Sequence, residues 1–218
     1  TPVMGHCRGS NSIRDAAISG FDLILHGTLM ETDALEAVVE RKTPIAPTFT
    51  FQANLIDYGH FVGASNYIKD LFRREIIDSA VMLRKAYDQG VPILCGTESG
   101  FSVTPYGQWH YREMEILMKE MGFTALEAIK SSTSVNAYAM RLEGEIGRVE
   151  EGAFADLIIV SADPIKDITS LGDQENIKMV MKSGEIQEFE EEKDRVPISG
   201  WRVVNYGQIL TKDLVNKK

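Results

Sequence analysis

The stretch "GHCRGSNSIRDAAISGFDLILHG" (residues 5–27) decides the fold of this chain. Apolar runs at residues 2–7 and 21–27 flank a polar middle, and each run ends in a histidine. Serines near the start of the middle segment can cap a helix, and Gly20 is a good terminator for it. A buried strand, a helix and a second buried strand predict parallel strands joined by a helix.

The same alternation continues to about residue 140. Further strands are predicted at residues 43–51 and 91–98, and the helical segments fall near residues 30–42, 66–89, 110–121 and 124–140. Continuous apolar strands that alternate with amphipathic helices indicate an α/β fold with a parallel sheet covered by helices. A (β/α)₈ barrel uses about 250 residues for eight such units. Four units in this length predict either a small open sheet or half of a barrel.

The pattern changes after residue 141. Residues 142–190 alternate turn signals with short strands, and "ENIKMVMKSGEI" reads as a β-hairpin that turns at Lys182-Ser183-Gly184. The tail, residues 191–218, has no clear period, and we expect its basic end to be loose. The predicted units are therefore residues 1–141, a small β region at 142–190, and the tail.

The composition describes an ordinary globular protein and excludes several classes of function. Of the 218 residues, 44% are hydrophobic and 25% charged, and the net charge is −9. This acidity argues against binding to nucleic acid or to anionic membranes. No apolar run approaches the roughly 18–20 residues of a membrane span. Two cysteines do not suggest a disulfide framework, so we expect a reducing, cytoplasmic location.

Four side chains that could bind a metal ion or take part in catalysis lie at the ends of the predicted strands. His6 and Cys7 end the first strand, His26 ends the second and Glu98 ends the fourth. The carboxyl ends of parallel strands are where α/β proteins assemble their active sites, so these side chains can converge. Two neutral imidazoles and a carboxylate are ligand types for Zn²⁺ or another divalent metal. A nearby cation would also make a desolvated Glu98 tolerable, and Glu98 could then ligate metal or accept a proton.

Structural alternatives exist for each of these residues. A histidine at a strand end is often only a hydrogen-bonded structural residue, and Cys7 is expected to be part of the core. His60 is expected on the surface of a long loop. His110 starts a helix and either lies on the surface or points into the cleft. Tyr67 and Tyr106 are weak candidates, with His110, for a substrate pocket.

Several segments resemble the metal-dependent amidohydrolase superfamily. Residues 5–27 resemble its fifth- and sixth-strand region, and "PTFTF" (47–51) resembles its seventh strand. "GTESG" (96–100) is similar to the "G-T-D-S-G" of its eighth strand. Residues 121–168 look like its closing segment, with "G-x-T-x-x-E-A-I", "T-x-N-A" and "G-x-x-A-D-L". The resemblance covers about residues 1–187, and the nearest branch is imidazolonepropionase-like and Xaa-Pro-dipeptidase-like.

The resemblance implies a fold, a chemistry and a set of residues. It implies the C-terminal half of a (β/α)₈ TIM-type barrel, strands five to eight, followed by part of a small β-sandwich domain. It implies one or two Zn²⁺-class ions that activate a hydroxide to attack the C–N bond of a small-molecule or peptide-like substrate. His6 and His26 would be metal ligands. Glu98 would be both a ligand and the catalytic group that shuttles the proton.

Two departures from the family pattern set limits on this interpretation. Glu98 stands where the family usually has aspartate, and the extra methylene alters the reach of the carboxylate. The family's strand-one H-x-H pair and strand-four lysine have no counterpart in residues 1–218, and we expect them upstream in a longer protein. The fragment alone is therefore expected to be inactive.

A second interpretation makes the chain a binding or assembly module. Four strands leave two open sheet edges, and such edges favour pairing with another chain. On this interpretation the half-barrel is not catalytic, and two copies could close a pseudo-barrel. We therefore expect a homo-oligomer.

Overall fold

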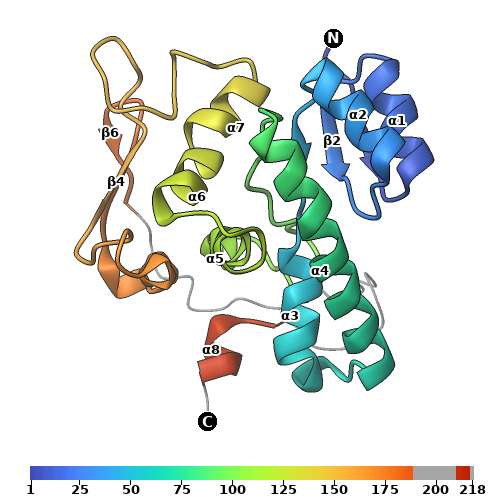
Figure 1. Ribbon diagram of the computed structural model, residues 1–218. Helices are drawn as coiled ribbons and strands as arrows, with labels where there is room; N and C mark the ends of the chain where they lie inside the picture. The colour runs from blue at the N-terminus through green and yellow to red at the C-terminus, as the bar shows by residue number, and fades with distance from the viewer. Residues whose placement is uncertain (189–209, 217–218) are drawn as a thin grey trace.

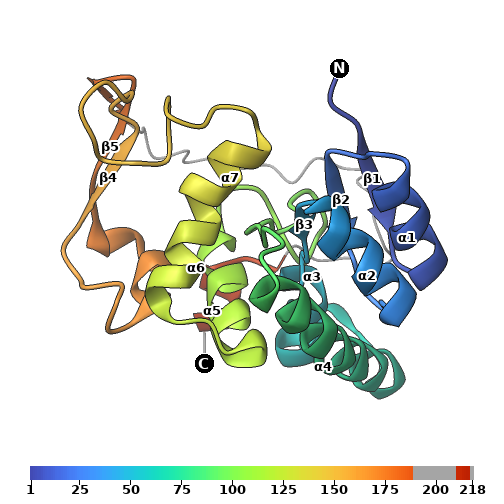
Figure 2. The same ribbon diagram turned by 45° about the horizontal axis from the view of Figure 1, so that its top comes forward.

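The first sheet lies at the N-terminal end of the computed structural model, which describes residues 1–188 and 210–216. Its three short strands are parallel and follow the order β1-β2-β3. They are β1 (Met4–Cys7), β2 (Leu23–His26) and β3 (Ile45–Ala46). The connecting helices are α1 (Ser10–Ile18) and α2 (Thr32–Arg41), which lie side by side against this sheet (Figure 1 and Figure 2). The predicted α/β class is therefore confirmed.

One face of this sheet is buried under helices and the other is not. Cys7 and Ile24 are 6% and 0% exposed and belong to the main core, as expected for Cys7. On the opposite face Met4 is 64% exposed, and Leu23 and Leu25 are only half-buried. Helices thus cover one face of the sheet, and the other face is left more exposed.

The third strand is much shorter than the predicted span of residues 43–51. It ends at Ala46 because Pro47 has no amide hydrogen to donate, and Thr48 has a left-handed backbone with φ 56°. Helix α3 (Thr50–Tyr58) begins directly afterwards, so part of the expected strand and of the expected long loop is helical. A 3₁₀ helix, η1 (Gly59–Val62), continues from α3.

The fourth predicted strand, residues 91–98, is reduced to one bridge. Ile93 pairs in parallel with Ile45, the Ile45 amide donates to the Pro92 carbonyl, and the Leu94 amide donates to the Ile45 carbonyl. The fourth position in the sheet is therefore occupied in the predicted place, although the chain departs from strand geometry before Glu98. The residues that follow form the loop that carries Glu98.

The remaining helices match the predicted segments, with one break. They are α4 (Asn66–Asp88), α5 (His110–Met121), α6 (Ala125–Ser132) and α7 (Ser134–Ala139). The predicted helix 124–140 is divided at Thr133, whose φ of −124° and ψ of −93° are not helical. Helices α5, α6 and α7 lie between the two sheets (Figure 1). Among the described residues, no helix has both the length and the apolar character needed to span a membrane.

The main hydrophobic core joins the outer face of the sheet to α1, α2, α4 and α5. Its fully buried side chains include Ile13, Ile24, Val38, Ile45, Phe49, Leu83 and Leu117. Each such side chain contributes about 1.5–3 kcal/mol through removal from water. This core fixes the strand ends, and therefore the residues that follow them.

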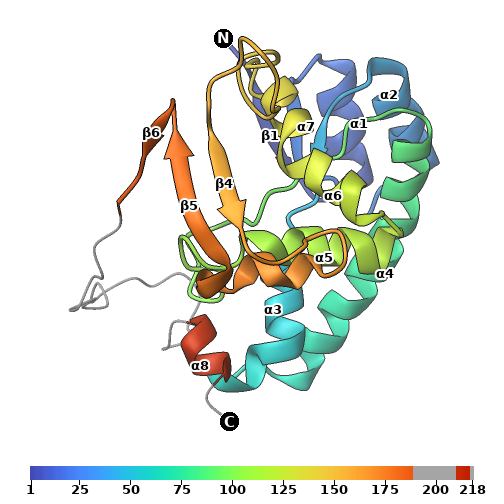
Figure 3. The same ribbon diagram turned by 90° about the vertical axis from the view of Figure 1, so that its left-hand side faces the viewer.

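A second sheet is formed by residues beyond 141. Its antiparallel strands are β4 (Leu157–Val160), β5 (Ile177–Lys182) and β6 (Glu185–Ile186), with η2 (Ile168–Gly172) and η3 (Gln174–Asn176) before β5. The predicted hairpin is confirmed, because Lys182 pairs with Glu185 across Ser183 and Gly184, whose φ angles are 52° and 84°. This sheet stands apart from the first (Figure 3).

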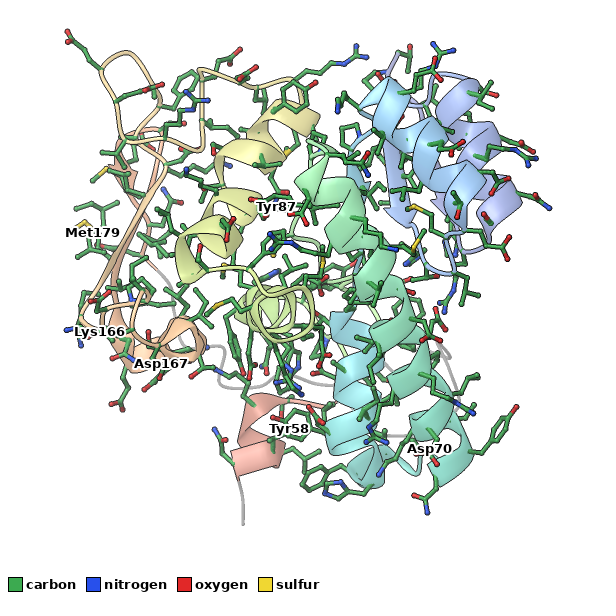
Figure 4. All side chains as sticks on the ribbon, in the orientation of Figure 1. Tyr58, Asp70, Tyr87, Lys166, Asp167 and Met179 are labelled. Carbon is green, nitrogen blue, oxygen red and sulfur yellow. The ribbon has the colours of Figure 1, made fainter. Side chains whose placement is uncertain are left out.

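Part of the tail packs against the body of the protein. Of residues 191–218, the structure describes 210–216, which include the short helix α8 (Lys212–Asn216). Leu210 is fully buried, and its carbonyl accepts a hydrogen bond from the Trp109 indole at 3.0 Å. Tyr58 of α3, labelled in Figure 4, packs its ring against Trp109. Residues 210–216 are therefore docked, contrary to our expectation of a loose basic end, and Lys217 and Lys218 lie outside the described residues.

Candidate functional site

Two imidazole rings meet at the carboxyl ends of β1 and β2. His6 Nδ1 lies 3.4 Å from His26 Nε2, and the ring centroids are 4.2 Å apart at an interplanar angle of 64°. Strict strand alternation would turn His26 to the same face as its paired residue Cys7. Its φ of 71° breaks that alternation, and its ring reaches His6 instead.

The tautomer of His26 follows from its hydrogen bond to Thr48. Thr48 Oγ1 lies 2.6 Å from His26 Nδ1, and the same hydroxyl donates its single hydrogen to the Pro47 carbonyl at 2.7 Å. Since that hydrogen is already used, Thr48 Oγ1 must accept from His26 Nδ1–H. His26 Nε2 therefore carries the lone pair, and it is this atom that faces His6.

Burial keeps His26 uncharged at neutral pH. The ring is 4% exposed, and desolvation, followed by repulsion from His6 and Arg8, lowers its pKa from 6.5 to about 4. A neutral imidazole with one nitrogen fixed as a donor is the form that binds a metal ion.

Glu98 provides the third group. Its Oε1 lies 3.8 Å from His26 Nε2, and its side chain is 26% exposed. Burial raises the pKa of Glu98, while electrostatic interactions with His6 and Arg8 act in the opposite direction. Arg8 is itself paired with Glu75 of α4. The structure thus brings together the three residues that the sequence placed at strand ends, His6, His26 and Glu98.

Three residues at these strand ends adopt left-handed backbone conformations. The φ angles are 71° at His26, 56° at Thr48 and 52° at Glu98. For residues other than glycine this conformation costs roughly 1–3 kcal/mol each, and it persists where the surroundings impose it. Gly27 follows His26 with φ 63°, and a Cβ there would lie 2.7 Å from Ile45 Cγ2. The chain therefore turns sharply at each strand end.

The donor set suits a divalent ion. His6 Nδ1 and His26 Nε2 lie 3.4 Å apart, close enough for both nitrogens to bind one divalent ion. Glu98 Oε1, 3.8 Å from His26 Nε2, is an oxygen donor next to this pair. Within residues 1–188 and 210–216, however, no three histidine, cysteine or acidic side chains converge tightly enough to form a ready-made cage. His6 and His26 therefore fit a metal ion as two members of a larger ligand set, with Glu98 beside them at 3.8 Å from His26.

Comparison with known proteins identifies the family. The sequence profile of the amidohydrolase family matches residues 1–187. The chain belongs to the amidohydrolase family. The amidohydrolase resemblance expected from the histidine and closing segments is thereby confirmed.

This amidohydrolase chain covers only part of the length of its individual relatives. A solved Xaa-Pro dipeptidase with methionine in its active site is 31% identical, with a TM-score of 0.72 over 87% of this chain and 45% of that one. An uncharacterised protein of Mycobacterium tuberculosis is 26% identical over 166 residues, which are 74% of this chain and 42% of the relative. The A. niger ochratoxinase, 21% identical with a TM-score of 0.69 over 85% and 41%, is similar in fold. The chain spans less than half the length of each.

The other candidate residues of this amidohydrolase lie on its surface. His110 is exposed at the first position of α5, and Tyr67 and Tyr106 are 71% and 64% exposed. His60 is exposed as expected, although it lies in η1 and not in a loop. The role of His110, Tyr67 and Tyr106 in substrate binding stays a prediction.

Sequence reasoning missed two buried residues behind the site. Thr48 fixes the His26 tautomer, and no motif marks a threonine for this task. Glu113 is fully buried in α5 and accepts hydrogen bonds from the backbone that follows Thr48. A signal for Glu113 was present, because it shares the apolar face of α5 with Ile116 and Leu117, three and four positions later.

Proposed function

We propose that this chain provides half of the active site of a metal-dependent amidohydrolase that hydrolyses a C–N bond. The observation that carries the proposal is the lone pair of a neutral, buried His26 directed at His6 and Glu98. Membership of the amidohydrolase family supports it. On this proposal the first sheet is strands five to eight of a (β/α)₈ barrel, and the second sheet is part of a smaller β domain.

The two histidines would hold the ion on this side of the site. His26 would bind through Nε2, since its Nδ1–H is committed to Thr48, and His6 would bind through Nδ1, the atom that faces His26. A divalent ion bound there would supply Lewis-acid activation of water and of the scissile carbonyl. The ligands that complete the set would come from outside this chain, as we expected from the family pattern.

Glu98 would hold and transfer the proton. A carboxylate whose pKa is raised by burial is closer in proton affinity to water and to a leaving nitrogen at neutral pH. Its Oε1 faces the imidazole pair, so it is within reach of a substrate bound there. The Thr104 hydroxyl donates to the Glu98 carbonyl at 3.0 Å and restrains this residue. We therefore assign Glu98 as both ligand and proton carrier.

We propose a dipeptide-like substrate. The support is the similarity to the Xaa-Pro dipeptidase, which is 31% identical and was solved with an amino acid in its active site. Nothing in the three site residues distinguishes a peptide from another amide, because all three act at the scissile bond. Specificity would therefore reside in the surrounding loops, including the segments that carry Tyr67, Tyr106 and His110.

Metal content in matched variants tests the proposal. The chain should bind Zn²⁺, and His6→Ala and His26→Ala should each reduce its affinity by tenfold or more. His60→Ala is the matched control, because it removes an exposed histidine from η1 and should change nothing. Isothermal titration with Zn²⁺ measures the four affinities, those of the parent and of the three variants. If all three variants bind like the parent, the site assignment is wrong.

A second candidate function is supported by the uncovered inner face of the first sheet. Met4 is 64% exposed, and Leu23 and Leu25 are half-buried, on a face that would line the interior of a barrel. Exposed apolar surface of this kind favours association. The assembly module, in which two copies pair through their open sheet edges, therefore stays the alternative, and this apolar face would add to the contact between the copies.

A further inference from the structure

Helix α3 has an unusual N-terminus. It begins at Thr50, and the residue before it is Phe49. The Phe49 side chain cannot accept a hydrogen bond from the first-turn amides, which have no partner within the helix. Such amides need partners when they are buried, and both Phe49 and Thr50 are fully buried. The partner comes from a different helix, 63 and 64 positions further along the chain.

Glu113 of α5 supplies that partner with both carboxylate oxygens. Oε1 accepts from the Phe49 amide at 2.9 Å, and Oε2 accepts from the Thr50 amide at 2.7 Å and from the Thr50 hydroxyl at 2.6 Å. The backbone of Thr48 also stabilises the ionised carboxylate. The Glu113 side chain is itself completely buried, so these bonds are not shared with solvent.

This arrangement fixes the residue that controls His26. Thr48 immediately precedes the two amides that Glu113 holds, and its backbone is left-handed with φ 56°. Because the next two residues are fixed, the Thr48 hydroxyl is kept between the Pro47 carbonyl and His26 Nδ1. A shift of the α3 N-terminus would move Thr48 and release the ring.

We propose that Glu113 is a positioning residue for the metal site, acting through the start of α3 and Thr48 to hold His26 with Nε2 directed at His6. The expected change in metal affinity rests on the proposed function. The link from Glu113 through Thr48 to the orientation of His26 does not depend on it. Outer partners of histidine ligands typically change metal affinity by about 10–100-fold when removed. Glu113 acts one step further away than Thr48, so we expect about a tenfold effect.

A double-mutant cycle on the 218-residue chain tests the proposal with Zn²⁺ as the probe. Glu113→Gln and Thr48→Val should each weaken Zn²⁺ binding about tenfold, and the double variant should bind no more weakly than Thr48→Val alone. Losses that multiply to about a hundredfold would show that the two residues act independently and would overturn the proposal. So would an unchanged affinity in Glu113→Gln.

The matched control is Glu127→Gln. Glu127 also accepts hydrogen bonds at a helix N-terminus, from the Thr124 amide and hydroxyl at 2.8 Å each, but it caps α6. It also accepts from the hydroxyl of Tyr87, the residue labelled on α4 in Figure 4, at 3.0 Å. It should lower thermal stability and leave Zn²⁺ affinity unchanged. If Glu113→Gln does not fold, Thr50→Val removes only the hydroxyl bond to Glu113 and should weaken Zn²⁺ binding a few-fold. Unchanged binding in that variant would overturn the proposal.

A metal-free measurement separates this inference from the proposed function. Nitrogen chemical shifts of the His26 ring report its tautomer. The parent chain, kept metal-free by a chelator, should show Nδ1–H almost exclusively. Glu113→Gln should add a substantial Nε2–H population. If the parent binds no Zn²⁺, the proposed function fails, yet this tautomer shift still decides the role of Glu113. An unshifted tautomer would overturn that role whatever the metal affinity.

Discussion

Lowering the pH from 7 to 5 in the presence of a chelator should change the stability of this chain very little, because two buried groups respond in opposite directions. His26 has a pKa lowered to about 4 by burial, and Glu113 has a pKa raised to about 7 by burial. The side chains are 5% and 0% exposed, so solvent screens neither of them appreciably. Each therefore couples folding to proton binding.

The contribution of His26 to the free energy of unfolding decreases as the pH falls. Its pKa in the folded chain lies below the ordinary 6.5, so the unfolded chain binds more protons between pH 6.5 and pH 4. Stability is lost as the pH falls through this window. With a folded pKa of about 4, the loss between pH 7 and pH 5 is about 2 kcal/mol.

The Glu113 contribution increases over the same interval. Its pKa in the folded chain lies above the ordinary 4.5, so the folded chain binds more protons between pH 7 and pH 4.5. Its stabilising contribution is complete below pH 4.5 and is lost as the pH rises through about 7. Between pH 7 and pH 5 it adds about 2 kcal/mol, which offsets the loss from His26.

Single substitutions separate the two contributions. Between pH 7 and pH 5 the free energy of unfolding of Glu113→Gln should fall by about 2 kcal/mol, and that of His26→Gln should rise by about 2 kcal/mol. These changes should hold whatever the stability of each variant at pH 7. Urea unfolding followed by tryptophan fluorescence, to which the buried Trp109 (1% exposed) contributes, measures these changes. If both variants follow the parent across this range, the buried titrations we describe do not govern its stability.

Three further predictions concern other parts of the chain. Gly27→Ala should destabilise by about 2 kcal/mol more than Gly20→Ala in thermal unfolding, because both have positive φ but only the first Cβ would meet a side-chain methyl at 2.7 Å. In a Trp201→Phe background, which leaves Trp109 as the remaining tryptophan of the sequence, deleting residues 210–218 should shift the emission to longer wavelength, since it removes the carbonyl bonded to that indole; an unshifted spectrum would contradict the docking of this segment. Met4→Glu should reduce self-association in light scattering, and a monomeric parent would remove the basis for the assembly alternative.

The sequence was sufficient for the class of the fold and for the ends of the strands. Apolar runs and helix signals predicted the parallel sheet, and the residue following each run marked His6, His26 and Glu98. These features are local, because they depend on neighbours within a few positions. The end of β3 was missed although Pro47 marks it in the sequence. Helix α3 was missed because its N-terminus is held by Glu113 of α5, more than 60 positions away.

The tautomer and the supporting residues could not be predicted for a related reason. Nothing in the sequence distinguishes Thr48 from other threonines in or near strands. Its role follows only from its distances to His26 and to the Pro47 carbonyl. Glu113 was detectable as a carboxylate on an apolar helix face, but its partners are main-chain amides, which carry no sequence signal. Residue identity thus indicated which groups were present, and tertiary contacts determined their orientation.

The left-handed residues at the site favour the enzymatic interpretation over the assembly module. His26, Thr48 and Glu98 each adopt a conformation that is unfavourable by roughly 1–3 kcal/mol, and each is restrained by a specific hydrogen bond. A half-barrel that served only to pair its open edges would gain nothing from this, since the strained residues lie beyond the strands and not along them. The left-handed turns instead leave His26 Nε2 3.4 Å from His6 Nδ1 and 3.8 Å from Glu98 Oε1, an arrangement that serves chemistry at the strand ends.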